Sequence, residues 1–561
     1  MLKRYGYTKL TENLDIINNR DVFLKKYIEL IDNISFENNS RIWWASEFAS
    51  KNRFTTNLPE LLFQFTQSIN AIKNLKCDTL IILSPSQYLT NSLYKYGKDL
   101  DRKVFPISHG IIYKNIFMFN KIYFYLRLIK QALIIYIRSI RARISLKNNK
   151  RALDTNICRL IISHVYEDSF DISNKYQDKF FGKLPEFLSE NSNLIFFVHI
   201  HGNFSNVLKK IRNNNTHQLI PFEYFIHFRD ILLGIIQISS GKIKLHDIKY
   251  NGLDITDIVK SEFKRSGIHL YHWLMYEGTR NLLKYYKFDS AYMTYENIAW
   301  ENMLIMSLKQ FSYNTKIIGY QHSVVPQSAA GMFIGKKEKE IKPLPDKLLT
   351  VGLETTTILR DYGNYPGSMI DTGCALRYEY LERIKQKKTQ NTDYILLALE
   401  GISEVSDMVN YVLKYVNKLK DYNFIIRTHP ALTWGNIQDN IKFDINRFSN
   451  VTLSHNTTLI DDLNQTDICI YWGSTVALEA LSMGIPLIHY DIQSILSYDP
   501  LFRCNHLKWT LTNKDSLLRI IKTIKSLSNE EYTKQANLAK AYIKRYFYPV
   551  SEKNMSKFVY N

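Results

Sequence analysis

The chain has 561 residues, of which 45% are hydrophobic and 22% are charged, and its formal net charge is +20. This length exceeds one ordinary hydrophobic core, so two domains are expected, and the composition excludes a disordered or fibrous protein. Lysines and arginines are spread along the whole chain. That distribution indicates a general attraction to polyanions, and no recognised nucleic-acid-binding module is present.

Strands and helices alternate through the first part of the chain. The predicted strands are residues 78–84, 157–165, 193–201, 289–294, 315–320 and 347–351. Such alternation predicts a parallel sheet, which binds ligands at the carboxyl ends of its strands. We assign residues 1–384 to an N-terminal Rossmann-like domain and the polar, lysine-rich residues 385–392 to a linker.

Residues 114–151 combine apolar and basic side chains at helical spacing. One predicted face carries Ile122, Tyr125, Ile129, Leu133, Tyr136 and Ile140, and the other carries Arg127, Lys130, Arg138 and Arg141. Lys121, Arg127 and Lys130 interrupt any window long enough to span a bilayer. Two interpretations stay open: a helix that lies on an anionic membrane, or one packed on its own domain with the basic stripe in solvent.

Three polar side chains follow predicted strands of this domain. Glu296 and His322 follow neighbouring strands, so we expect them at the same rim. There they would deprotonate an acceptor hydroxyl or stabilise the charge that develops near the anomeric carbon of the donor. Asp168 is the candidate carboxylate nucleophile of a double displacement. The alternatives are local: a helix N-terminal carboxylate for Glu296, and a hydrogen bond to a nearby carbonyl for His322.

Three histidines lie at the ends of two predicted strands of this domain. His164 lies at the end of the strand that precedes Asp168, and together with Glu167 and Asp168 it forms one candidate set. His199 and His201 share one face of the strand over 193–201 but lack a third ligand nearby in sequence, so we assign them to structure.

The second part of the chain repeats the alternation. Strands are predicted over 393–399 and 423–427, and polar residues follow each of them: Glu400 after the first, and Arg427, His429 and Pro430 at the end of the second. Because these strand ends share one edge of the sheet, the side chains are expected to face a common crevice.

The segment from residue 467 to residue 491 is the most informative. A strand over 467–471 leads through Gly473, Ser474 and Thr475 into a helix over 476–482. This turn gathers free backbone N–H groups and two hydroxyls, which suits a phosphate, although Ser474 as a simple helix cap is the alternative. Glu479 lies one helical turn further on, where its carboxylate would accept hydrogen bonds from ribose hydroxyls.

Together these motifs resemble a known family. Arg-x-His-Pro followed by Gly-Ser-Thr-x-x-x-Glu-Ala-Leu-x-x-Gly-x-Pro is similar to the nucleotide-binding domain of GT-B glycosyltransferases. More narrowly, it resembles bacterial capsule and lipopolysaccharide transferases with a His-Pro motif, a group that includes sialyl- and Kdo-transferases using CMP-sugars. The resemblance covers about residues 390–495. It implies that His429 contacts the donor phosphate and that Ser474 and Thr475 hold phosphate or ribose.

We therefore predict an α/β protein with two Rossmann-like domains facing a cleft (GT-B) and a helical C-terminal segment. Residues 393–528 would bind the nucleotide-sugar, and residues 529–561 would carry a helix that crosses back to the first domain. After Pro500 we expect mainly helix. The predicted donor-binding residues are Arg427, His429, Gly473, Ser474, Thr475, Glu479 and Glu400.

The predicted activity is glycosyl transfer at the cytoplasmic face, from a nucleotide-sugar to a growing glycan or lipid-linked acceptor of a surface polysaccharide. A CMP-linked acid such as Kdo is the first candidate donor, with UDP- and GDP-sugars open. Five cysteines without paired spacing argue for a cytoplasmic protein, and residues 1–6 lack the apolar core of a secretion signal.

No cofactor or metal is expected, because no Asp-x-Asp signature stands at a strand end and the pair Asp461-Asp462 reads as solvated helix surface. The alternatives are a polyol-phosphate transferase, a sugar-nucleotide epimerase of similar fold, or a non-catalytic polysaccharide assembly protein.

Overall fold

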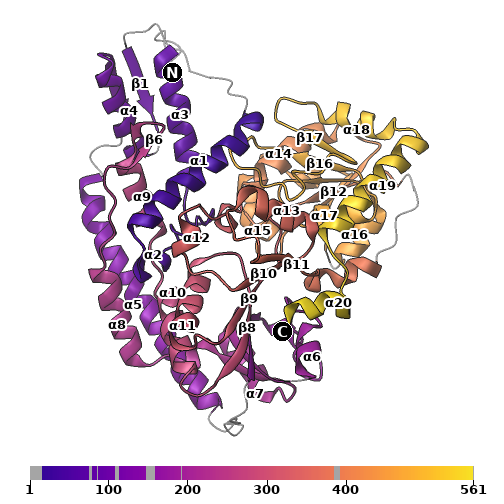
Figure 1. Ribbon diagram of the computed structural model, residues 1–561. Helices are drawn as coiled ribbons and strands as arrows, with labels where there is room; N and C mark the ends of the chain where they lie inside the picture. The colour runs from indigo at the N-terminus through magenta and orange to yellow at the C-terminus, as the bar shows by residue number, and fades with distance from the viewer. Residues whose placement is uncertain are drawn as a thin grey trace.

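The structure is a computed structural model that describes residues 16–74, 79–84, 86–107, 113–146, 158–190, 192–383, 392–402, 404–455 and 457–559. Two parallel sheets, each covered by helices, lie in the two halves of the molecule (Figure 1). This arrangement confirms the predicted fold class. The predicted linker over 385–392 lies outside the described residues except for Thr392.

The N-terminal half is built on a seven-stranded parallel sheet within the described ranges. Its order is β11 (Ile370–Thr372), β10 (Lys347–Thr350), β9 (Lys316–Gln321), β8 (Phe288–Thr294), β3 (Cys158–Val165), β4 (Asn193–Ile200) and β5 (Gln218–Pro221). The central strands are continuous apolar runs because helices cover both faces of the sheet.

Most of the helices in the described ranges belong to this half. They are α1 (Ile16–Glu37), α2 (Arg41–Trp44), α3 (Leu58–Asn74), α4 (Gln87–Asp99), α5 (Tyr113–Leu146), α6 (Leu184–Ser189), α7 (Phe204–Asn213), α8 (Phe228–Ser240), α9 (Thr256–Ser266), α10 (Leu270–Leu282), α11 (Ala299–Phe311), α12 (Glu338–Ile341) and α13 (Leu353–Tyr362).

The C-terminal half contains a six-stranded parallel sheet within the described part of the chain. Its order is β14 (Val451–Leu453), β13 (Asn423–Arg427), β12 (Tyr394–Ala398), β15 (Thr466–Tyr471), β16 (Leu487–Tyr490) and β17 (Lys508–Leu511). The helices are α14 (Val405–Val416), α15 (Trp434–Ile437), α16 (Leu459–Gln465), α17 (Val476–Ser482), α18 (Leu517–Lys525), α19 (Asn529–Tyr546) and α20 (Glu552–Met555).

Two sequence predictions about strands need correction. The strand predicted over 78–84 exists as β1 (Thr79–Leu83), but it pairs with β2 (Lys103–Ile107) in a small separate sheet and not with the main sheet. The region after Pro500, predicted as mainly helical, also contributes the edge strand β17. The remaining described strands are β6 (Lys249–Tyr250) and β7 (Leu253–Asp254), which have two residues each and pair in an antiparallel hairpin.

Helix α5 does not bury the apolar face that the sequence predicted. Its buried positions include Leu128, Ile135 and Ala142, whereas most of the predicted apolar face is exposed. The exposed large hydrophobic residues of α5 are Ile122, Tyr123, Tyr125, Leu126, Ile129, Leu133, Ile134, Tyr136, Ile137, Ile140 and Ile144. The side chains of residues 113–121, Lys121 included, lie outside the described part. Within the described ranges, no helix has the length and apolarity needed to cross a bilayer.

An apolar core and the chain end join the two halves. One buried cluster includes Tyr320 and Val351 of the N-terminal half together with Leu396 of the other half. Helix α19 packs on both α17 and α13, and beyond it the backbone N–H of Tyr548 donates to the carbonyl of Val351 at 2.9 Å. The chain therefore returns from the second sheet to the first.

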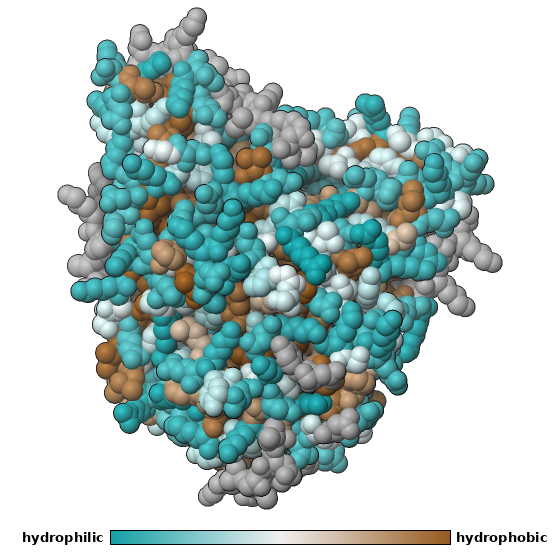
Figure 2. Space-filling view, viewed as in Figure 1, coloured by the Kyte–Doolittle hydropathy of each residue, from teal (hydrophilic) through white to brown (hydrophobic). Residues whose placement is uncertain are grey.

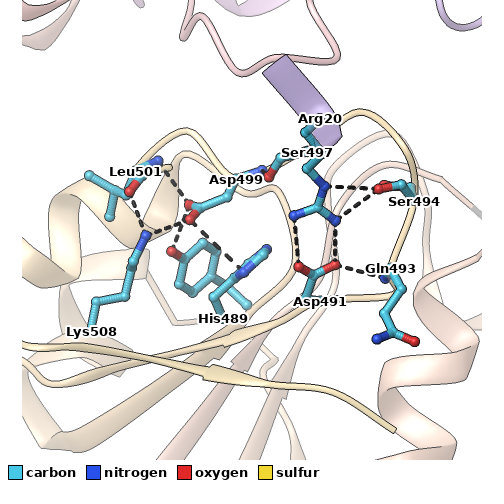
Figure 3. Close-up of polar contacts among 10 residues, drawn as sticks. Arg20, His489, Asp491, Gln493, Ser494, Ser497, Asp499, Leu501 and Lys508 are labelled. Atoms are coloured by element: carbon cyan, nitrogen blue, oxygen red, sulfur yellow. Dashed lines mark hydrogen bonds and ion pairs between the residues drawn. The ribbon is translucent and has the colours of Figure 1, made fainter. Parts of the chain in front are cut away.

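A buried ion pair adds a second connection (Figure 3). Arg20, in the first turns of α1, donates two hydrogen bonds to the carboxylate of Asp491 at 2.8 and 2.9 Å. It also donates to the carbonyl of Ser494. Beside it, the buried carboxylate of Asp499 accepts from Lys508 at 2.7 Å. These contacts hold the loop after β16 against the start of α1.

Candidate functional site

A cavity of about 210 Å³ lies between the carboxyl ends of the two sheets. The C-terminal half contributes five residues that the sequence singled out, namely Glu400, His429, Gly473, Ser474 and Thr475. The N-terminal half contributes Glu296, the loop after β9, and residues 50–54, which lie between α2 and α3. The structure thus brings three C-terminal strand ends together with one predicted catalytic residue.

His429 is oriented by its own turn. The chain leaves β13, and the backbone N–H of Ala431 donates to Nδ1 of His429 at 3.1 Å. Because Nδ1 acts as an acceptor, the ring proton of the neutral imidazole sits on Nε2, which is the tautomer that donates a hydrogen bond. The ring packs against Gly401, where a Cβ atom would lie 2.9 Å from Nδ1.

The turn after β15 leaves hydroxyls at the cavity. Helix α17 begins with Thr475 as its N-cap, and the Thr475 side chain makes no capping hydrogen bond. Ser474 Oγ instead accepts from the backbone N–H of Val476 at 3.3 Å. Gly473 allows close approach, since its Cβ would lie 3.1 Å from Oε2 of Glu400. That Glu400 oxygen is buried without a hydrogen-bond partner among the described atoms.

Glu296 and His322 meet on the opposite wall. Glu296 Oε1 lies 3.7 Å from Nδ1 of His322. The Glu296 turn is held by the buried carboxylate of Glu301, which accepts the backbone N–H groups of Glu296 and Ile298 at 3.0 Å. Burial lowers the pKa of His322 well below its ordinary value, and nearby Arg377 adds to the shift. His322 is therefore a neutral imidazole behind the half-exposed Glu296 carboxylate.

Arg53 was not predicted from the sequence, although it supplies a cation to this cavity. Its guanidinium donates to Ser328 Oγ at 2.7 Å, lies 3.8 Å from Glu400 Oε1, and stacks 4.6 Å from the ring of Tyr498. The neighbouring Lys51 is already paired with buried Glu338 at 2.8 Å. The available signal was weak: a short polar loop, Lys51-Asn52-Arg53, between two hydrophobic helices.

Two predicted donor-binding residues lie outside this cavity. Arg427 is held by Asp462 at 2.6 Å and Ser454 Oγ at 3.0 Å, because the buried Asp462 carboxylate requires a cationic partner. The prediction that Asp462 is solvated surface is therefore wrong, whereas Asp461 is exposed. Glu479 is buried beside Tyr380. Burial raises the pKa of Glu479 to about 7, although a hydrogen bond from Tyr380 acts in the opposite direction.

Asp168 also lies away from the cavity. Its side chain is 76% exposed and pairs with Lys179, whose hydrogen bond lowers the pKa of Asp168. The histidines near it form a packed cluster: His164 Nδ1 lies 2.9 Å from His201 Nε2, and His199 contacts the hydroxyl of Tyr271. The structural role expected for His199 and His201 fits this packing.

The cavity combines groups suited to a phosphorylated sugar. Arg53 and His429 offer positive or donating groups, Ser474 and Thr475 offer hydroxyls, and the carboxylate of Glu400 can accept hydrogen bonds from sugar hydroxyls. Within the described ranges, no group of three or more His, Cys, Asp or Glu side chains is arranged to hold a metal ion.

Comparisons with known proteins find similarity only among solved structures. No protein-family model and no curated protein matches the chain. A glycosyltransferase from Rickettsia africae ESF-5 is 14% identical, with a TM-score of 0.41, and the match covers 72% of this chain and 97% of that one. The glycosyltransferase SnogD from Streptomyces nogalater is 10% identical, with a TM-score of 0.41, covering 72% of this chain and 99% of its own.

A UDP-GlcNAc 2-epimerase from Neisseria meningitidis, bound to UDP-GlcNAc, is 10% identical with a TM-score of 0.38. That match covers 69% of this chain and 99% of the epimerase. A fold does not determine an activity, so the activity is argued from the residues of the cavity.

Proposed function

We propose that this protein is a glycosyltransferase that moves a sugar from a nucleotide-sugar to a glycan acceptor. The observation that carries the proposal is the cavity between the two sheets, where His429, Ser474 and Thr475 face Glu296 and Arg53. A donor-binding surface on one half and a general base on the other are what a transfer between two bound substrates requires.

In the proposed reaction, the acceptor hydroxyl attacks the anomeric carbon while Glu296 takes its proton. The bond from that carbon to the phosphate oxygen breaks, and its electron pair leaves with the nucleotide. The Nε2–H of His429 and the guanidinium of Arg53 stabilise the negative charge that grows on the phosphate. The neutral imidazole of His322 lies behind the base, with Nδ1 3.7 Å from Glu296 Oε1.

We propose that the donor is a CMP-linked sugar acid, with Arg53 pairing with the sugar carboxylate, and that UDP- and GDP-sugars are the competing donors. The acceptor is a surface glycan of the capsule or lipopolysaccharide type, extended at the cytoplasmic face of the membrane. We further propose that no divalent ion is required, since Arg53 and His429 supply the stabilising groups.

Thermal unfolding of the full chain with CMP, CDP, UDP or GDP tests donor binding. A nucleotide at one hundred times its dissociation constant should stabilise the fold by about 2.7 kcal/mol. Absence of stabilisation by all four would contradict the proposal. Release of an altered free sugar without acceptor would instead identify an epimerase, and activity abolished by EDTA and restored by manganese would refute metal independence.

The Glu296→Gln variant tests the proposed base. It should retain nucleotide binding, because Gln preserves the size of the side chain, and lose transfer by about 10²–10⁴-fold. A variant with full transfer activity would remove Glu296 from the mechanism.

A further inference from the structure

Helices α5 and α8 present a continuous apolar surface to solvent. More than half of the exposed large hydrophobic side chains in the described ranges lie on these two helices. Tyr123, Leu126 and Ile144 of α5 are 68%, 59% and 72% exposed, and Phe228 of α8 is 61% exposed. This amount of outward apolar side chain is unusual for a monomer surface and marks an interaction site.

The two helices act as one surface because they pack on each other. The ring of Tyr136 on α5 lies 5.6 Å from that of Phe228 on α8. Both helices run along the outer edge of the N-terminal half, away from the second sheet (Figure 1), and brown apolar residues gather over α8 in the space-filling view (Figure 2). From Ile122 to Ile144 the apolar face extends roughly 33 Å along α5.

The charges on this surface all have one sign. Helix α5 contains no aspartate or glutamate, and the one acidic residue of α8, Asp230, is buried and bonded to Asn281. Lys130, Arg141 and Arg229 are exposed on the same pair of helices. The surface therefore combines aromatic and aliphatic side chains with exposed cations.

We propose that α5 and α8 form a docking surface for an anionic phospholipid bilayer. The apolar side chains would enter the boundary between headgroups and acyl chains, and the cations would pair with lipid phosphates. A second copy of the chain fits less well, because two such surfaces would bring like charges together in a protein of formal charge +20. This inference does not depend on the proposed reaction.

Co-sedimentation of the full chain with vesicles tests the surface. We expect binding to vesicles of phosphatidylcholine with 30% phosphatidylglycerol, weaker binding to phosphatidylcholine alone, and loss of binding at high salt. Leu133→Glu on α5 should weaken binding on the order of tenfold. Lys130→Gln combined with Arg141→Gln should weaken binding to the anionic vesicles by about thirtyfold, or about fivefold per charge.

The matched control is Leu538→Glu, an exposed leucine on α19 (40% exposed), which should bind vesicles like the unmodified chain. Thermal unfolding of each variant checks that it folds. The proposal would be overturned by equal binding to both kinds of vesicle or by no binding to either. It would also be overturned if the chain forms a dimer that Leu133→Glu dissociates without a change in vesicle binding. Nucleotide binding, measured without vesicles, reports on the proposed function separately.

Discussion

The backbone N–H of Ala431 donates to Nδ1 of His429, so the ring proton of the neutral imidazole lies on Nε2. The His-Pro turn therefore sets the tautomer of the ring as well as its position. Because Gly401 lies directly behind the ring, the orientation of His429 depends on two separate loops.

Replacing His429 by alanine should remove one donor to the leaving phosphate. We expect a 10²–10³-fold loss of kcat in a transfer assay, with little change in thermal stability because the side chain is only half-buried. His455→Ala is the matched control, since His455 belongs to the C-terminal half but lines a different pocket. Equal activities of the two variants would exclude His429 from the reaction.

Gly401→Ala should displace the imidazole without removing it. The new Cβ would lie 2.9 Å from His429 Nδ1, so the ring has to move away from its hydrogen bond. We expect transfer activity to fall toward that of His429→Ala while the fold remains. Gly435→Ala on the same half has no contact closer than 4.0 Å and should stay fully active; a similar loss in both would argue against this mechanism.

Arg53→Ala should weaken the grip on the donor from the N-terminal half. Loss of this cation should lower kcat/KM by about 10²-fold or more. Arg53→Lys should restore only part of the lost kcat/KM, because an ammonium group lacks the planar, bidentate geometry of the guanidinium. Steady-state kinetics with varied donor concentration measures this. Arg447→Ala, which alters an exposed surface pair, is the control. Unchanged donor kinetics in Arg53→Ala would place the donor elsewhere.

The connection between Arg20 and Asp491 should contribute strongly to stability. Arg20→Ala leaves the buried Asp491 carboxylate without its cation and should cost about 3–5 kcal/mol in the free energy of unfolding. Urea unfolding measures the cost. Arg545→Ala is the control. Arg545 is 57% exposed, and its buried partner Glu354 keeps Arg503 at 4.0 Å, so this change should cost about 0–1 kcal/mol. A small, equal cost for both would mean that the ion pair does not secure the two halves.

Stability should fall as the solution becomes acidic. Burial, reinforced by nearby His201, lowers the pKa of His164 to about 3, whereas the unfolded chain takes up this proton near pH 6.5. Below pH 6.5 the unfolded state therefore binds more protons, and this one group should reduce the free energy of unfolding by about 2 kcal/mol at pH 5.

Urea unfolding between pH 7.5 and 5.0 tests this. In His164→Asn the number of protons taken up on unfolding should fall by about one, so the free energy of unfolding should depend less steeply on pH. An unaltered slope in His164→Asn would show that this histidine does not titrate on unfolding.

Local patterns in the sequence predicted the strands, because buried parallel strands are short apolar runs between turn residues. They also placed Glu296, Glu400, His429 and Ser474 at strand ends, and parallel strands bring such ends to one edge. The cavity contains all four.

The sequence patterns could not predict which side chains long-range packing brings to the cavity. Arg427 pairs with Asp462, a buried carboxylate 35 residues away, and does not line the cavity. Arg53 lines it instead, from a loop near the start of the chain. Likewise, the periodicity of α5 shows an apolar face but not which face meets the protein. Helical spacing orders side chains around one axis, whereas the partner that each of them contacts is set by how distant segments pack.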